Sequence, residues 1–209
     1  MLEVPVYNIS GQKIDTLKVD EQVLGGTVNA ALVKQAVVAY HANQRQGTAQ
    51  TKSRADVAGS TRKLYRQKGT GNARRGNVRT NVMKGGGMAF AKRTRDFRQA
   101  LPKKMRQAAL KSAILAKLLG SDLMVLDGLN LDAPKTAQMA KVLQALQINR
   151  SCLLTLAQRD ANVYLSSRNL PDLTVRIAEE LNAYDVATRQ KMIVTLDAMK
   201  ALVGQESAQ

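Results

Sequence analysis

The chain has 209 residues, of which 44% are apolar, and 32 basic against 16 acidic side chains give it a net charge of +16. This length accommodates one domain with a sizeable core, or one domain with an appendage, and no apolar stretch approaches the roughly 20 residues of a membrane-spanning helix. A single cysteine excludes an internal disulfide, a single histidine excludes a histidine metal cluster, and the N-terminus lacks the pattern of a signal peptide, so we expect a cytoplasmic protein with no membrane contact, metal or cofactor.

The first 44 residues are predicted to form two strands and a helix. Residues 4–9 and 13–17 flank a Ser-Gly-Gln turn, and the second run alternates between apolar and polar side chains, as half-buried strands do. Residues 28–43 repeat apolar side chains at helical spacing, with Thr27 as the candidate N-cap. His41, near the polar end of this helix, is predicted to be a surface residue or a partner of the dipole at the helix C-terminus.

Residues 45–98 follow no sustained helical or strand period, and their composition differs from that of the rest of the chain. From Arg45 to Arg106 there are 18 lysines and arginines against two acids, whereas the remaining 147 residues carry 14 basic and 14 acidic side chains. Eight of the 14 glycines fall between Gly47 and Gly87. Such a segment buries too little apolar surface to offset the entropy of ordering it, so we expect it to need a partner.

Helices and short apolar strands alternate after the basic segment. Helices are predicted from Pro102 to Gly120, from Pro134 onward, over residues 161–167, from Glu179-Glu180, and up to Gly204. Strands are predicted at residues 123–126, 151–156, 173–175 and 192–196. Asp132 and Asp197 are the candidate N-caps of the second and the last helix.

This alternation predicts an α/β fold in three layers, with a mainly parallel sheet covered by helices on both faces. The predicted globular domain consists of residues 1–44 and 99–209. A long, extended basic loop, residues 45–98, is inserted in it.

No catalytic constellation is found, although α/β folds often bind nucleotides. Gly69-Thr70-Gly71 is the nearest approach to a G-x-G-x-x-G fingerprint, but Arg74 stands at the third glycine and no strand precedes the run. The carboxylates of the second half are scattered singly. Cys152 lies in an apolar run and is predicted to be a buried small residue rather than a nucleophile. We therefore predict no enzyme activity.

The basic segment has the composition of an RNA ligand. Its guanidinium and ammonium groups bind phosphates, its hydroxyls and amides can reach 2′-hydroxyls and base edges, and its glycines allow close backbone approach. The cations do not alternate with acids, as those of a solvated face usually do. The predicted RNA-binding residues are Arg45, Lys52, Arg54, Arg62, Lys63, Arg66, Lys68, Arg74, Arg75, Arg79, Lys84, Lys92, Arg93 and Arg95.

Five motifs in this order resemble one family, the universal large-subunit ribosomal protein four in its bacterial form. The resemblance covers essentially the whole chain. The motifs are Arg45-Gln46-Gly47-Thr48, Thr51-Lys52-Ser53-Arg54-Ala55-Asp56-Val57, Gln67-Lys68-Gly69-Thr70-Gly71-Asn72-Ala73-Arg74, Gly85-Gly86-Gly87 with Phe90, and Leu101-Pro102-Lys103-Lys104.

The resemblance implies a Rossmann-like domain on the outer surface of the large ribosomal subunit. Its loop would thread through large-subunit ribosomal RNA to the nascent-peptide exit tunnel, so the implied partners are this RNA, neighbouring ribosomal proteins and the nascent polypeptide. The implied tip residues at the tunnel wall are Arg66, Gln67, Lys68, Gly69, Thr70 and Gly71. Some members also repress their own operon. The alternative hypothesis is an RNA-modifying enzyme with an α/β catalytic domain and a basic substrate-binding arm.

Overall fold

The computed structural model describes residues 1–204 and divides the chain into two compact units. The first unit consists of Met1–His41 together with the chain from Gln99 onward, and the second is Ala42–Arg98. Residues 44–102 contain no helix and no strand beyond a single bridge between Ser53 and Met88.

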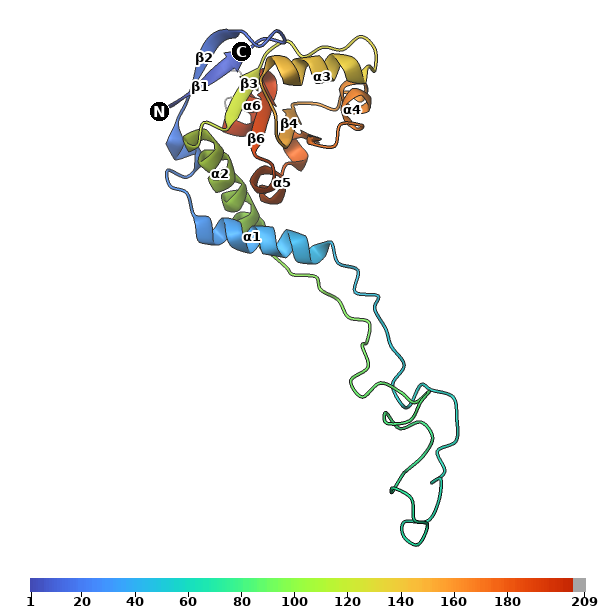
Figure 1. Cartoon of the computed structure of the whole chain (residues 1–209). Coiled ribbons are helices and arrows are strands. Elements are labelled where there is room, and N and C mark those ends of the chain that lie inside the picture. The colour runs from blue at the N-terminus through green and yellow to red at the C-terminus, as the bar shows by residue number, and fades with distance from the viewer. Residues whose placement is uncertain (205–209) are drawn as a thin grey trace. The chain divides into compact units, whose positions relative to one another are not determined.

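The first unit is built from six strands, six α-helices and two short 3-10 helices within the described residues (Figure 1). The strands are β1 (Leu2–Tyr7), β2 (Lys13–Val19), β3 (Leu123–Leu126), β4 (Cys152–Leu156), β5 (Leu173–Ile177) and β6 (Lys191–Thr195). The α-helices are α1 (Ala30–Asn43), α2 (Lys103–Leu119), α3 (Thr136–Ala145), α4 (Ala161–Ser167), α5 (Ala183–Thr188) and α6 (Leu196–Val203). The 3-10 helices are η1 (Glu21–Leu24) and η2 (Ala178–Glu180).

All strands join one sheet in the order β2-β1-β3-β6-β4-β5. Only the hairpin of β1 and β2 is antiparallel, and every other neighbouring pair is parallel. The last strand, β6, lies between β3 and β4, so the chain runs outward to β5 and then returns to the middle of the sheet. The predicted α/β class with a mainly parallel sheet is confirmed.

Alternate side chains of the central strands enter two separate cores. In β6, Met192 and Val194 belong to a core with residues of α2, α5 and α6, whereas Ile193 belongs to a core with residues of α3 and α4. This alternation follows from the period of two of a β-strand. The sheet is therefore covered on both faces, which confirms the three predicted layers.

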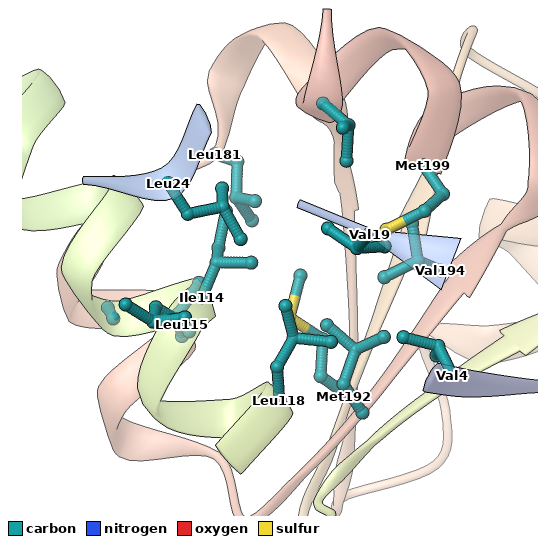
Figure 2. Packing of buried hydrophobic residues seen from close by; sticks show 14 of the residues in the cluster. Val4, Val19, Leu24, Ile114, Leu115, Leu118, Leu181, Met192, Val194 and Met199 are labelled. Atoms are coloured by element: carbon teal, nitrogen blue, oxygen red, sulfur yellow. The ribbon is translucent and has the colours of Figure 1, made fainter. Parts of the chain in front are cut away.

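Figure 2 shows how the larger core fills the space between α2 and the sheet. Ile114, Leu115 and Leu118 of α2 are at most 9% exposed and pack beside Met192 and Val194. Burying one such side chain stabilises a fold by about 1.5–3 kcal/mol. This packing therefore anchors α2 to the sheet of the first unit.

A polar contact adds to this anchor at the C-terminal end of α2. The ammonium of Lys117 donates hydrogen bonds to the carbonyls of Arg189 at 2.7 Å and Gln190 at 2.8 Å. Partial burial lowers the pKa of Lys117, and the nearby Asp122 acts in the opposite direction. Lys191, the first residue of β6, forms an ion pair with Asp122 at 2.6 Å.

The predicted cap of α1 is wrong. This helix begins at Ala30, two residues later than predicted, and the side-chain oxygen of Asn29 accepts a hydrogen bond from the backbone of Leu32 at 3.0 Å. Thr27 lies three positions before the first helical residue, whereas the N-cap is the residue next to it.

The other two predicted caps are also wrong. The N-cap of α3 is Lys135, so Asp132 lies before the helix, and that of α6 is Thr195, so Asp197 lies in the first turn. Neither actual cap accepts a side-chain hydrogen bond. The helix predicted from Glu179-Glu180 is the 3-10 helix η2, and α5 begins after it, with its cap at Asn182.

Candidate nucleic-acid interface

The basic segment is a pair of stems joined by a lobe. We define the stems as residues 45–53 and 87–97, and the lobe as residues 54–86. The stems are held together by backbone hydrogen bonds from the amide of Thr51 to the carbonyl of Lys92 at 3.0 Å and from the amide of Arg95 to the carbonyl of Gly47 at 3.2 Å. The hydroxyl of Thr51 also accepts from the amide of Lys92 at 2.7 Å. These bonds pair the stems without forming a regular ladder.

Two glycines permit the close approach of the two stems. A Cβ added to Gly87 would lie 2.2 Å from the backbone nitrogen of Arg54, and one added to Gly47 would lie 1.9 Å from the carbonyl oxygen of Arg95. Gly47 also has a φ of +71°, which residues with a side chain rarely adopt. The close crossing of the chain at these points therefore requires glycine.

The end of the lobe is closed by short hydrogen bonds around the predicted tip, residues 66–71. The amide of Leu64 donates to the carbonyl of Gly76 at 2.9 Å, and the Tyr65 hydroxyl donates to the carbonyl of Ala73. Within the tip, the guanidinium of Arg66 donates to the carbonyl of Gly69 at 2.7 Å. Gln67, Lys68, Gly69 and Gly71 are exposed, and Thr70 is half-buried.

The predicted RNA-binding cations form no ion pair within the described part of the chain. None of the three ion pairs among residues 1–204 involves a side chain of the basic segment. Arg79 is half-buried, and its Nε has no hydrogen-bond partner in the described part of the chain. The other thirteen predicted cations are exposed: Arg45, Lys52, Arg54, Arg62, Lys63, Arg66, Lys68, Arg74, Arg75, Lys84, Lys92, Arg93 and Arg95.

Both acids of the segment are engaged with its own backbone. The carboxylate of Asp56 accepts from the hydroxyl of Ser53 at 2.6 Å and from its amide at 3.1 Å, and these hydrogen bonds lower the pKa of Asp56. The carboxylate of Asp96 accepts from the amide of Arg98 at 2.8 Å. The acids therefore stabilise turns, and the exposed surface of the segment stays strongly positive.

Sequence reasoning missed the role of Phe97. The guanidinium carbon of Arg45 lies 3.8 Å from the centre of the Phe97 ring, and that of Arg95 lies 4.3 Å from it. A cation–π contact at an exposed site contributes about 0.5–1 kcal/mol. The two arginines come from different stems. Only the contact of Phe97 with Arg95, two residues before it, could have been predicted from neighbouring residues in the sequence.

A second feature that sequence reasoning missed is the exposed apolar surface of the segment. The side chain of Phe90 is 98% exposed, that of Val82 is 87% exposed and that of Met88 is 58% exposed. The fold of the segment itself leaves Phe90 and Val82 almost fully exposed and covers Met88 only in part.

The first unit has a cleft where nucleotides bind in many α/β proteins, at the carboxyl ends of the parallel strands. This cleft of about 590 Å³ is lined by Asp127 after β3, Asp160 after β4 and Asp197 after β6, and no lysine or arginine lines it. Its carboxylates repel phosphate, and the carboxylate of Asp160 is engaged in capping α4. In residues 1–204 no group of three or more histidines, cysteines and acids could hold a metal ion.

Cys152 lies in β4 and is 1% exposed, which confirms that it is a buried small residue. Burial raises the pKa of its thiol to about 12, so the thiolate needed for nucleophilic attack is not formed near neutral pH. His41 is exposed, as predicted.

Comparison with known proteins assigns the chain to a family. The family model described as "Ribosomal protein L4/L1 family" matches residues 17–205, most of the chain. The chain belongs to the ribosomal protein L4/L1 family. This confirms the resemblance seen in the basic segment and makes the chain a ribosomal protein rather than an enzyme, so the hypothesis of an RNA-modifying enzyme is wrong.

Relatives in this family match the chain over nearly its full length. A protein of Dehalococcoides mccartyi named large ribosomal subunit protein uL4 is 46% identical over 209 residues, covering 99% of this chain and 100% of the relative. Proteins of the same name from Symbiobacterium thermophilum and Moorella thermoacetica are 43% and 41% identical, each covering 95% of this chain and 96% of the relative. Among the described residues, no helix combines the length and the apolarity needed to cross a membrane.

Proposed function

We propose that the chain is a structural constituent of the large ribosomal subunit in the cytoplasm, and that residues 45–98 bind large-subunit ribosomal RNA. The observation that carries this proposal is the state of the fourteen cations: thirteen are exposed, and none forms an ion pair within residues 1–204. Phosphate contacts dominate the affinity of proteins for nucleic acids, so exposed cations that form no ion pair within the chain suit such a ligand.

Irregular backbone favours RNA over duplex DNA as the ligand. The segment offers no helix or strand to enter a major groove, whereas its paired stems and glycine turns suit the irregular surface of folded RNA. The names of the relatives support the same choice, because they are large ribosomal subunit proteins.

The tip is proposed to lie at the wall of the nascent-peptide exit tunnel and to meet the nascent polypeptide there. This part of the proposal is supported by the family motif at residues 66–71. Gly69 and Gly71 have φ values of +79° and +69°, so the chain turns there without large side chains. The first unit would dock on the outer surface of the subunit beside neighbouring ribosomal proteins.

The salt dependence of RNA binding tests the proposal. If on the order of ten cations contact phosphates, affinity for purified large-subunit RNA should fall about 10³- to 10⁵-fold between roughly 50 and 200 mM salt, and somewhat less for irregular RNA than for duplex DNA. Filter binding of the full chain across this range measures the slope. An affinity that does not change with salt would contradict the proposal.

Co-sedimentation supplies a second test of the same proposal. The chain should sediment with large ribosomal subunits at moderate salt and leave them only under high-salt washing, because phosphate contacts weaken as salt rises. Protein that stays in the free pool at moderate salt would argue against a ribosomal location.

We also propose, from the family resemblance, that the chain represses its own operon. The same cations would contact phosphates of the leader of its messenger RNA. Footprinting of the chain on that leader tests the proposal, and the absence of protection at concentrations that protect ribosomal RNA would remove it.

A further inference from the structure

The two stems line an open cavity at the base of the basic segment. Its volume is about 940 Å³, and every residue that lines it belongs to the stems or to Gln44 beside them. Four of the lining residues are cations, namely Arg45, Lys92, Arg93 and Arg95, and none is an acid. The cavity is several times larger than one phosphate and therefore has room for a short stretch of nucleotide backbone.

Phe97 organises the cations of this cavity. Its ring is part of the lining. The guanidinium carbon of Arg45, from the first stem, lies 3.8 Å from the centre of the ring, and that of Arg95, from the same stem as Phe97, lies 4.3 Å from it. Two guanidiniums of like charge repel each other, so holding both against one ring restricts side chains that would otherwise separate. The hydrogen bond from the amide of Arg95 to the carbonyl of Gly47 fixes the backbone of the same layer.

Polar lining groups distinguish this cavity from a general basic surface. Gln44, Gln46 and Thr48 provide amide and hydroxyl groups beside the cations. Guanidiniums bind phosphate oxygens through two parallel hydrogen bonds, and amides and hydroxyls can pair with the 2′-hydroxyls of RNA.

We propose that this cavity is a preformed site for the sugar–phosphate backbone of RNA, in which Phe97 is a positioning residue that holds the guanidiniums of Arg45 and Arg95 for phosphate contact. This inference rests on the proposed RNA-binding function and adds to it a defined site and an uncharged residue. It distinguishes the base of the segment from the lobe, where no guanidinium of the described residues lies over an aromatic ring.

The test is the substitution Phe97→Leu in the full chain, which changes no charge. Affinity for purified large-subunit RNA should fall about tenfold, because the two guanidiniums lose their support. The slope of log affinity against log salt should also become shallower by roughly 1–2, since each phosphate contact contributes about 0.7–0.9 to it. A substitution that only loosened an uncharged contact would leave that slope unchanged.

Two variants control this result. Phe97→Tyr keeps a ring for both guanidiniums and should restore affinity and slope to near those of the wild type. Phe90→Leu removes the other phenylalanine of the segment, over which no guanidinium of the described residues lies, so its slope should match that of the wild type. Hydrogen exchange at the Arg95 amide shows whether the stems of each variant remain paired.

The outcomes separate the inference from the function on which it rests. Wild-type protein that fails to bind the RNA would overturn the proposed function as well. If the wild type binds normally and Phe97→Leu has the same affinity and the same salt slope, only the role of Phe97 would be overturned. Failure of Phe97→Tyr to restore the affinity and the slope would overturn that role as well. Competition by polyglutamate as effective as that by RNA of equal charge would overturn the assignment of the cavity to RNA.

Discussion

Burial determines the chemistry of Cys152. Its position inside β4 removes the thiol from water, and the resulting rise of its pKa from an ordinary 9.0 to about 12 favours the neutral form. A lone cysteine in this environment contributes packing and no reactivity. Because the pKa of the thiol differs between the folded and the unfolded chain, the stability of the fold depends on pH in the alkaline range.

Wild-type protein should lose stability as the pH rises above 9.0, because the unfolded chain then releases the thiol proton while the folded chain retains it up to about pH 12. By about pH 10 this linkage lowers the free energy of unfolding by roughly 1 kcal/mol. Urea unfolding at about pH 8 and about pH 10 measures the change for wild type and Cys152→Ala.

The change in the free energy of unfolding between the two pH values should be roughly 1 kcal/mol smaller in Cys152→Ala than in wild type. The variant is also expected to be less stable at both values through lost packing, so only the difference between them is informative. An equal pH dependence in the two proteins would show that the thiol titrates alike in the folded and unfolded chains.

At the residue scale, the sequence predicted which residues are buried better than it predicted which residues contact one another. The burial of Cys152 was predictable because its neighbours are apolar. The caps were not, because Thr27, Asp132 and Asp197 have suitable side chains but do not occupy the extended position before the first turn. The contact of Phe97 with Arg45 joins residues of different stems, so no local pattern records it.

At the element scale, the stems of the basic segment depend on the absence of a side chain at particular glycines. Gly87 crosses Arg54 so closely that an added Cβ would contact its backbone rather than a movable side chain. Gly76 lies in the same segment, but a Cβ there would have an ordinary contact with Thr80 at 3.8 Å. The two glycines therefore form a matched pair.

Gly87→Ala should separate the chain at this crossing, because the backbone of Arg54 cannot move without breaking the stem. The amide of Met88, which donates to the carbonyl of Lys52 at 3.0 Å, should then exchange about tenfold faster. Hydrogen exchange followed by NMR measures this rate.

Gly76→Ala is the control and should leave the Met88 amide protected. The free energy of unfolding of the first unit should be unchanged in both variants, since the substituted residues belong to the second unit. Equal exchange rates in the two variants would mean that the crossing accommodates a methyl group.

The elements of the first unit differed in how well the sequence predicted them. β3, β4 and β6 were predictable because parallel strands buried on both faces are nearly continuous apolar runs. Six-residue α5 was not located because it is too short for a helical period to emerge, and η2 occupies the place where its start was predicted. In the basic segment the pairing of Thr51 with Lys92 spans too many residues for any local signal.

At the scale of the whole molecule, charge and apolar burial are divided between two parts of the chain. The buried residues of both cores belong to the first unit, and the second unit carries the cations predicted to bind RNA. Composition alone indicated this division, since the block from Arg45 to Arg106 accounts for the entire net charge. Folding stability and RNA binding should therefore respond to different substitutions.

Deletion of residues 62–79 should spare the fold of the first unit while weakening RNA binding. The deletion removes seven lysines and arginines and no acid, but no residue of either core. The change in stability should be below about 0.5 kcal/mol, equivalent to a shift in Tm of about 1–2 °C. Calorimetry and RNA binding on the same preparation measure both properties.

An intact fold with reduced RNA affinity and a shallower salt slope is the expected combination. In ribosomes that incorporate the variant, the passage of nascent chains should also change if the tip lies at the tunnel wall. Collapse of the first unit on deletion would contradict the division of the chain into two parts.

The parallel pairing of β1 with β3 sets an order of events during synthesis. Val6 of β1 pairs with Val125 of β3, and the entire basic segment is made between these two strands. At roughly 5–20 residues per second, the segment is therefore complete about 1–5 seconds before β1 can gain its parallel neighbour. The most strongly charged part of the chain is thus exposed to cellular polyanions while the domain that carries it is still unfolded.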